Sequence, residues 1–107
     1  MVIDEVDMPD QFLEFAAEML RIMGHPQRLM IAQCLEAGEM NVSDLAQAIG
    51  CPQSSTSQHL KAMRMRGLLA SRRQGNCVFY SILRPEIYKI IQCVRQGAQK
   101  DTDQAPV

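Results

Sequence analysis

The hydrophobic period of this chain changes from helical to alternating near residue 67, and this change limits the folds that the chain can adopt. Upstream, apolar residues recur at three- and four-residue spacing, which predicts four helices, at residues 8–23, 26–37, 43–49 and 53–66. Downstream, two strand-like segments (68–73 and 77–82) flank a turn sequence, Gln74-Gly75-Asn76, and a last amphipathic helix follows Pro85. The chain is therefore predicted to be mainly α with one β-hairpin, in the order α-α-α-α-β-β-α.

A tight turn at Gly50-Cys51-Pro52 joins the third and fourth predicted helices. Two helices joined in this way are typical of a helix-turn-helix, and a basic hairpin directly after them is typical of a wing. We expect Ser43 to cap the first helix of the pair. The 107 residues suit one domain. We predict a winged helix-turn-helix over residues 8–99, with flexible tails at 1–7 and 100–107.

The net charge of −1 conceals a strong asymmetry along the chain. Residues 1–44 carry nine acids and two bases, whereas residues 45–85 carry six bases and no acid. A carboxylate beside a phosphate is repelled, so an acid-free basic segment favours a nucleic-acid partner. We expect this segment to face double-stranded DNA and the acidic half to face away from it. A chance cluster of solubilising surface bases is the alternative.

The predicted helix over residues 53–66 carries short polar side chains near its start and an apolar stripe on its other face. Such side chains can read base edges in the major groove or contact phosphates. Arginines near a hairpin tip can reach phosphates or the minor groove. Taken separately, these residues also suit a solvated helix face and a solubilising edge strand. The predicted DNA contacts are Gln53, Ser54, Ser55, Ser57, Gln58, Lys61, Arg72 and Arg73.

Four segments resemble the ArsR/SmtB family of bacterial transcriptional repressors. They are LRIMGHPQRLMIAQCL (20–35), VSDLAQAIG (42–50), PQSSTSQHLKAMRMRGLL (52–69) and SRRQGNCVFYSI (71–82). The resemblance spans roughly residues 10–95. It implies a homodimer formed by the first and last helices, which binds an inverted-repeat operator, represses transcription and leaves the DNA when an inducer binds.

Apolar stripes on the first and last predicted helices agree with the implied homodimer. A single winged domain of this length has no need of an outer apolar stripe on both helices, so a second copy is the expected partner. The predicted interface residues are Phe12, Phe15, Met19, Ile87, Ile90, Ile91 and Val94.

The metal sites of the family lack their ligands in this chain. Asn41 and Ser43 stand where the resemblance would place a Cys-x-Cys pair. The histidines, His25 and His59, have no partner at metal-ligand spacing. We therefore expect no metal and no cofactor. The positions of the last-helix zinc ligands are occupied by Arg84, Glu86, Gly97 and Lys100.

None of the four cysteines belongs to a Cys-x-x-Cys pair. In the sulfide- and oxidant-responsive branch of the family, one cysteine in the second helix and one in the last helix form the switch. The resemblance thus makes Cys34 and Cys93 the candidate sensor, although Cys34 is one residue late and Cys93 about two turns early. An oxidant or persulfide switch, a thiolate site for arsenite or a metal, and simple apolar packing all remain open. Packing is favoured for Cys51 and Cys77.

Other functional classes receive little support from the sequence. No carboxylate pair, Ser/His/Asp order or Gly-rich phosphate loop is present, so we expect no enzyme. The acidic N-terminus and the lack of an apolar run of about 18–20 residues predict a cytoplasmic protein without a membrane partner. Two alternatives remain: a regulator of the same fold with a non-thiol ligand or none, and a protein-binding winged-helix module. The acid-free segment disfavours the module.

Overall fold

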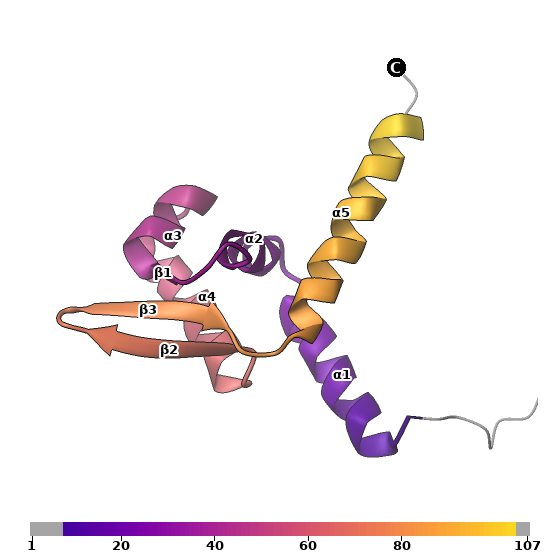
Figure 1. The fold of residues 1–107 in the computed structure, drawn as a ribbon, viewed down its shortest axis with the longest axis horizontal. Coiled ribbons are helices and arrows are strands. Elements are labelled where there is room, and N and C mark those ends of the chain that lie inside the picture. Colours follow the sequence, from indigo (N-terminus) through magenta and orange to yellow (C-terminus); the bar gives the residue numbers. More distant parts are fainter. Residues whose placement is uncertain (1–7, 105–107) are drawn as a thin grey trace, which may run out of the picture.

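A computed structural model describes residues 8–104 as five helices and a small antiparallel sheet (Figure 1). The elements are α1 (Asp10–Met23), α2 (Pro26–Leu35), β1 (Met40–Asn41), α3 (Val42–Ile49), α4 (Gln53–Met65), β2 (Leu69–Gln74), β3 (Cys77–Ile82) and α5 (Glu86–Gln104). The predicted order of four helices, a hairpin and a last helix is confirmed. No helix in this part of the chain is long and apolar enough to cross a membrane.

The structure continues α5 to Gln104, so residues 100–104 of the predicted tail are helical. No proline or glycine stands between Ala98 and Gln104 to end the helix, and polar residues such as lysine and glutamine are good helix formers. The predicted flexibility of residues 1–7 and 105–107 concerns segments outside the described residues.

The turn between α3 and α4 is built from local backbone signals. Asn41 caps α3, because its side-chain oxygen accepts a hydrogen bond from the Asp44 amide at 2.8 Å. Ser43, the predicted cap, lies inside the first turn instead. Gly50 ends α3 in the left-handed conformation, at a φ of 69°. Pro52 then precedes α4, and its carbonyl accepts a hydrogen bond from the buried hydroxyl of Thr56 at 2.9 Å.

The wing is a hairpin extended by a third strand that the sequence did not predict. The strand order is β1-β3-β2, with Met40 and Asn41 of β1 opposite Tyr80 and Phe79 of β3. The β2–β3 register runs from the Leu69–Ile82 pair to Gln74–Cys77, so Gly75 and Asn76 form the turn. Among residues 8–104, no third strand lies beside the strand pair beyond the end of β1.

The core lies between the helices and the base of the hairpin. Every helix contributes at least one fully buried side chain, and half-buried side chains of β1 and β3 pack against this cluster. Its least exposed large members are Met23, Ile31, Leu35, Leu45, Leu60, Met63, Leu68, Leu69 and Ile87. This packing holds α4 against α2 and α3, and it anchors the wing beside α4.

The ends of α1 and α5 lie on the side of the molecule opposite the wing tip (Figure 1). Of the predicted interface residues on these helices, Met19, Ile87 and Ile91 are buried in the core of their own protomer. Their assignment to a dimer interface is corrected, because the periodicity that marks an apolar face does not say which surface covers it. Phe12 and Val94 are exposed, while Phe15 and Ile90 are half-buried.

Candidate nucleic-acid interface

The outer face of α4 is polar and exposed, as the sequence predicted. Gln53, Ser54, Ser57, Gln58 and Lys61 are all exposed, and α4 has its buried stripe on the opposite side. Because residues three and four apart share a helix face, the last four of these side chains form one continuous row. The row has the size and chemistry of a surface that enters a major groove.

Two hydroxyl-bearing residues near the start of α4 have local roles. The hydroxyl of Ser55, which is half-buried, donates a hydrogen bond to the Pro52 carbonyl at 3.1 Å. The Gln53 amide donates to the Ser43 hydroxyl at 3.2 Å, so α3 holds the exposed side chain that directly precedes the row. Ser55 therefore supports the helix start more than it extends the exposed row.

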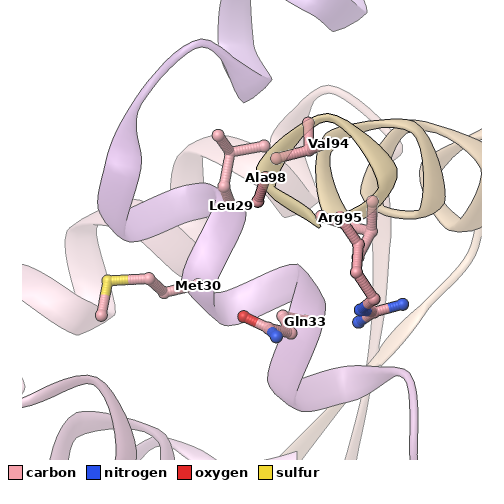
Figure 2. Close-up of a pocket in the computed structure, with 7 residues that line it drawn as sticks. Leu29, Met30, Gln33, Val94, Arg95 and Ala98 are labelled. Atoms are coloured by element: carbon pink, nitrogen blue, oxygen red, sulfur yellow. The ribbon is translucent and has the colours of Figure 1, made fainter. Parts of the chain in front are cut away.

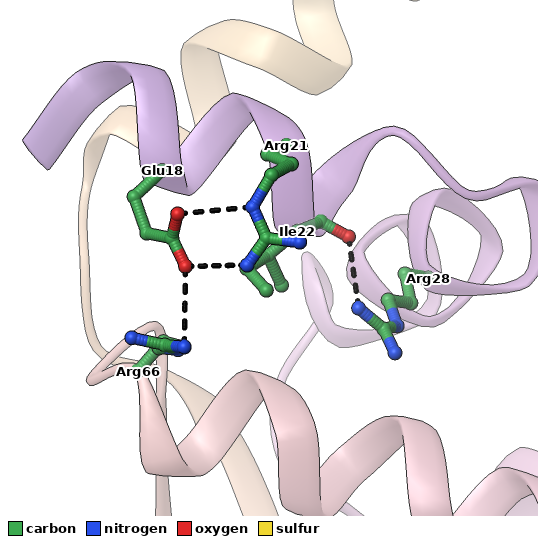
Figure 3. A network of polar contacts seen from close by, with 5 residues as sticks. All are labelled: Glu18, Arg21, Ile22, Arg28 and Arg66. Atoms are coloured by element: carbon green, nitrogen blue, oxygen red, sulfur yellow. Dashed lines mark hydrogen bonds and ion pairs between the residues drawn. The ribbon is translucent and has the colours of Figure 1, made fainter. Parts of the chain in front are cut away.

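Half of the bases in the acid-free segment are paired with carboxylates from elsewhere. Glu18 contacts both Arg21 and Arg66, at 2.6 and 3.4 Å (Figure 3). Glu39 contacts Arg72, and Glu86 contacts Arg84 at 2.6 Å. Two acids of the acidic half, Glu18 and Glu39, thus lie beside bases of the basic segment. Among the described side chains, those of residues 8–100, the bases of this segment without a carboxylate partner are Lys61, Arg64 and Arg73.

Arg64 was missed by the sequence reasoning, although it lies three residues after Lys61 on the same exposed face of α4. Its spacing was the available signal. Together, Lys61 and Arg64 place two unpaired positive charges at the end of the polar row. Such a row would place polar side chains at the edges of the DNA base pairs, and it would place the positively charged side chains at the flanking phosphates.

The two wing arginines point to opposite faces of the sheet. Arg73 stands opposite Val78, and Arg72 stands opposite Phe79. Directly opposed residues share a face, and successive residues alternate. Arg73 therefore shares the face of Tyr80, which packs against the core, whereas Arg72 lies on the outer face, with its guanidinium carbon 4.8 Å from the centre of the Phe79 ring.

A pocket of about 330 Å³ lies between the start of α3, the exposed face of α4 and the wing. Two serine hydroxyls, two asparagines and the exposed Cys77 contribute polar atoms to its wall. A sugar-phosphate strand between α4 and the wing would meet hydroxyl and amide groups here. The lining residues are Asn41, Val42, Ser43, Ser57, Asn76, Cys77, Val78 and Tyr80.

A contact between two histidines joins α4 to the start of α2. The sequence had shown no metal-ligand partner for either residue. The rings of His25 and His59 lie with their centres 4.5 Å apart. Arg28 donates hydrogen bonds to His59 Nδ1 at 3.1 Å and to the Ile22 carbonyl at 3.2 Å, the second of which is drawn in Figure 3. Burial lowers the pKa of His59, and the charges of His25 and Arg28 lower it further.

The candidate sensor cysteines lie on α2 and α5, which pack against each other. Cys34 is half-buried, and burial raises the pKa of its thiol, whereas Cys93 is exposed. Cys77 is exposed as well, so the packing role expected of it is not supported. Among the side chains that the structure describes, those of residues 8–100, no three of histidine, cysteine or carboxylate type gather as a metal site would require.

A second pocket, of about 210 Å³, lies between α2 and α5 (Figure 2). Its wall is mostly apolar, with the polar groups of Gln33 and Arg95 at one side. Arg95 also donates a hydrogen bond to Glu36 at 2.5 Å. The other lining residues are Leu29, Met30, Ile91, Val94 and Ala98.

Comparison with known proteins agrees with this geometry. The profile of the bacterial regulatory proteins of the arsR family matches residues 25–71. Nodulation protein NolR of Rhizobium meliloti is 37% identical over 90 residues, which cover 84% of this chain and 74% of NolR. Transcriptional repressor PagR of Bacillus anthracis is 42% identical over 81 residues, which cover 75% of this chain and 81% of PagR.

A solved structure shares the whole fold. The homodimeric winged helix-turn-helix DNA-binding domain from Mycobacterium bovis superposes with a TM-score of 0.76, over 95% of this chain and 97% of the other, at 24% identity. At that identity the match shows the common fold, while NolR and PagR show the family. This chain belongs to the ArsR family of bacterial regulatory proteins, which are DNA-binding transcriptional regulators and not enzymes.

Proposed function

We propose that this protein is a homodimeric repressor that inserts α4 into the major groove of an inverted-repeat operator and places the wing along the flanking backbone. One observation carries the proposal: the exposed face of α4 is a polar row that ends in two bases without a carboxylate partner in the described part of the chain. Base-reading side chains flanked by phosphate-binding charges are what operator recognition requires.

Exposed apolar side chains on α1 and α5 support the homodimer. Phe12 is 40% exposed and Val94 is 48% exposed, and α1 and α5 add Leu13, Leu20 and Tyr88 to this surface. All residues of α5 from 92 to 100 are exposed, so one protomer leaves the second half of this helix without a packing partner. A helix of this kind gains stability by packing against a second copy.

A two-fold dimer would place two recognition helices about 34 Å apart, which matches successive major grooves. The operator is therefore an imperfect inverted repeat with half-sites centred about one helical turn apart. A regulator of this kind acts in the cytoplasm, where bacterial DNA lies.

Selection from a random duplex library tests the proposal even though the operator sequence is not specified in advance. The dimer should enrich an inverted repeat, and its binding should weaken as salt rises. Lys61→Ala should weaken binding and lower the slope of log K against log salt by about 0.9 per protomer. A slope equal to that of the wild type would contradict a phosphate contact at Lys61, and enrichment of no sequence would contradict operator binding.

We further propose that thiol modification at Cys34 or Cys93 releases the DNA. This proposal is supported by the position of the two cysteines on α2 and α5, two helices that pack against each other. Operator binding is measured with reduced protein and after treatment with an oxidant, polysulfide or arsenite. Cys34→Ser and Cys93→Ser should bind normally and resist release. If both variants dissociate as the wild type does, the thiol switch is wrong.

The apolar pocket between α2 and α5 supports an alternative inducer, a small apolar molecule without thiol chemistry (Figure 2). In the Cys34→Ser/Cys93→Ser double variant, this alternative predicts normal release by such a molecule and none by polysulfide or arsenite. Screening that variant with a library of small apolar compounds therefore separates the two mechanisms.

A further inference from the structure

All three guanidinium nitrogens of Arg72 donate hydrogen bonds to groups of its own protomer. Its Nε donates to both carboxylate oxygens of Glu39 at 2.9 Å, and its Nη2 donates to the same carboxylate. Its Nη1 donates to the Gln74 side chain at 2.8 Å, and its guanidinium lies over the Phe79 ring. A phosphate would compete with Glu39 and Gln74 for this arginine, whereas Arg73 has no carboxylate partner among the described side chains of residues 8–100.

The Glu39–Arg72 ion pair spans the sheet from one edge to the other. Glu39 directly precedes β1, Arg72 belongs to β2, and β3 lies between them. Antiparallel pairing places Phe79 opposite both Asn41 and Arg72, so this is the last rung of the sheet that contains β1. Beyond it, residues 73–78 continue as a two-stranded ribbon that ends in the Gly75-Asn76 turn.

The position of the ion pair is therefore the pivot of the wing. β1 offers only two residues to hold the hairpin beside the start of α3. Two-stranded ribbons have little stability of their own, and they twist more than wider sheets. Arg72 stands on the last three-stranded rung, and its partner Glu39 lies two rungs nearer the body. This diagonal contact restricts the angle at which the ribbon leaves the body, and with it the position of Arg73 relative to α4.

We propose that Glu39 is a positioning residue for DNA binding, which acts through Arg72 to hold the wing at the angle that presents Arg73 to the phosphate backbone. The inference rests on the proposed function and deepens it, because it assigns different roles to the two wing arginines. Both partners of the ion pair are partly exposed, at 50% for the Arg72 side chain and 37% for that of Glu39. An exposed pair adds little to folding stability, so its effect is on geometry.

The direction in which one substitution changes DNA affinity separates this role from simple electrostatics. Glu39→Gln removes a negative charge close to the basic surface. If Glu39 only repelled DNA, or only competed with phosphate for Arg72, this variant would bind more tightly. The positioning role predicts the opposite: affinity for the selected duplex falls by about 3- to 10-fold, because the preorganisation of the wing is lost. The salt slope and the melting temperature stay unchanged.

A charge swap provides the rescue experiment. Arg72→Glu alone should bind much more weakly than the wild type. The double variant Glu39→Arg/Arg72→Glu restores an ion pair of the same total charge, and it should regain an affinity within about 3-fold of the wild type. If Arg72 contacts phosphate, the double variant stays as weak as Arg72→Glu, and its salt slope falls by about 0.9 per protomer. That result would overturn the inference.

Backbone relaxation measured by NMR tests the wing without any DNA. In the wild-type protein, the amides of Gly75 and Asn76 should have order parameters near those of rigid backbone, about 0.85, and in Glu39→Gln they should fall toward 0.6. Equal values in both proteins would contradict the positioning role. Failure of the proposed function would have a different signature, because the wild type itself would then lack salt-dependent duplex binding while the relaxation difference persisted.

Discussion

The side of the protomer formed by α3 and α4 and the side formed by α1 and α5 differ in how many large apolar side chains they expose. α3 and α4 bury theirs and expose a single large one, Met65, whereas α1 and α5 expose Phe12, Leu13, Leu20, Tyr88 and Val94. The first side carries the polar row and the unpaired bases. The difference indicates two partners of different chemistry: a hydrated polyanion for α4 and the wing, and an apolar protein surface for α1 and α5.

The largest expected effect comes from placing a charge in the apolar surface. Val94→Glu should convert the dimer to a monomer, because a carboxylate would be buried without a partner. Duplex affinity should then fall by about 100-fold or more, since the second half-site is no longer bound intramolecularly. Sedimentation and duplex titration measure the two effects. Ala48→Glu, which adds the same charge to an exposed position of α3, should stay dimeric. If Val94→Glu also stayed dimeric, the apolar surface of α1 and α5 would not be the dimer interface.

On the polar side, Gln58→Ala should reduce discrimination between sequences. Losing one base-edge contact costs about 1–3 kcal/mol per site, or roughly 5- to 150-fold between the selected duplex and a scrambled one. Competition binding against both duplexes measures this ratio. An equal loss on both would remove Gln58 from the base-reading residues and leave it a backbone contact.

The exposed cysteines allow the two sides to be probed in one sample. Iodoacetamide should alkylate Cys77 faster than Cys34, since burial raises the pKa of the Cys34 thiol and restricts access to it. Addition of the selected duplex should slow alkylation of Cys77, which lines the pocket between α4 and the wing, and leave Cys93 unchanged. Mass spectrometry of the peptides gives each rate. Equal protection of both would contradict a DNA site confined to the wing side.

The smallest effect concerns the histidine pair that joins α4 to α2. The pKa of His59 is lowered from 6.5 in the folded protein, so the unfolded state takes up a proton more readily as pH falls. The free energy of unfolding should therefore be highest above pH 6.5 and decrease below it, as pH falls through the folded pKa. Urea titrations from mildly alkaline to mildly acidic pH measure this decrease. His59→Gln should show a shallower decrease, and an identical one would assign the effect to other groups.

The order of elements could be predicted because each element carries its own local signal. Helical periods, Gly50, Pro52 and the hairpin turn at Gly75 all act over a few residues. β1 was missed because two residues carry no period, and its partner strand is far away in the sequence, with Met40 opposite Tyr80. Met19, Ile87 and Ile91 were assigned to the wrong partner for a similar reason: a stripe predicts burial, but packing decides what covers it.

The candidate site shows the same limit. The sequence identified the polar row of α4, since spacing alone places those residues on one face. It assigned Arg72 and Arg73 the same role. The positive charge of an arginine indicates that its partner is negatively charged, but it does not indicate which negatively charged group the partner is. Glu39 lies 33 residues before Arg72 in the chain, and only the β1–β3–β2 sheet brings them together. Long-range pairing of charges is therefore the information that the sequence lacked.

The most direct test of the account compares the salt dependence of two variants with equal charge loss. Lys61→Ala/Arg64→Ala/Arg73→Ala removes the three bases that lack a carboxylate partner on the α4 and wing side. Lys89→Ala/Arg95→Ala/Lys100→Ala removes three bases from α5. We predict that the slope of log K against log salt falls by about 2.7 per protomer in the first variant and stays near the wild-type value in the second. Equal slopes in the two variants would contradict a DNA interface on α4 and the wing.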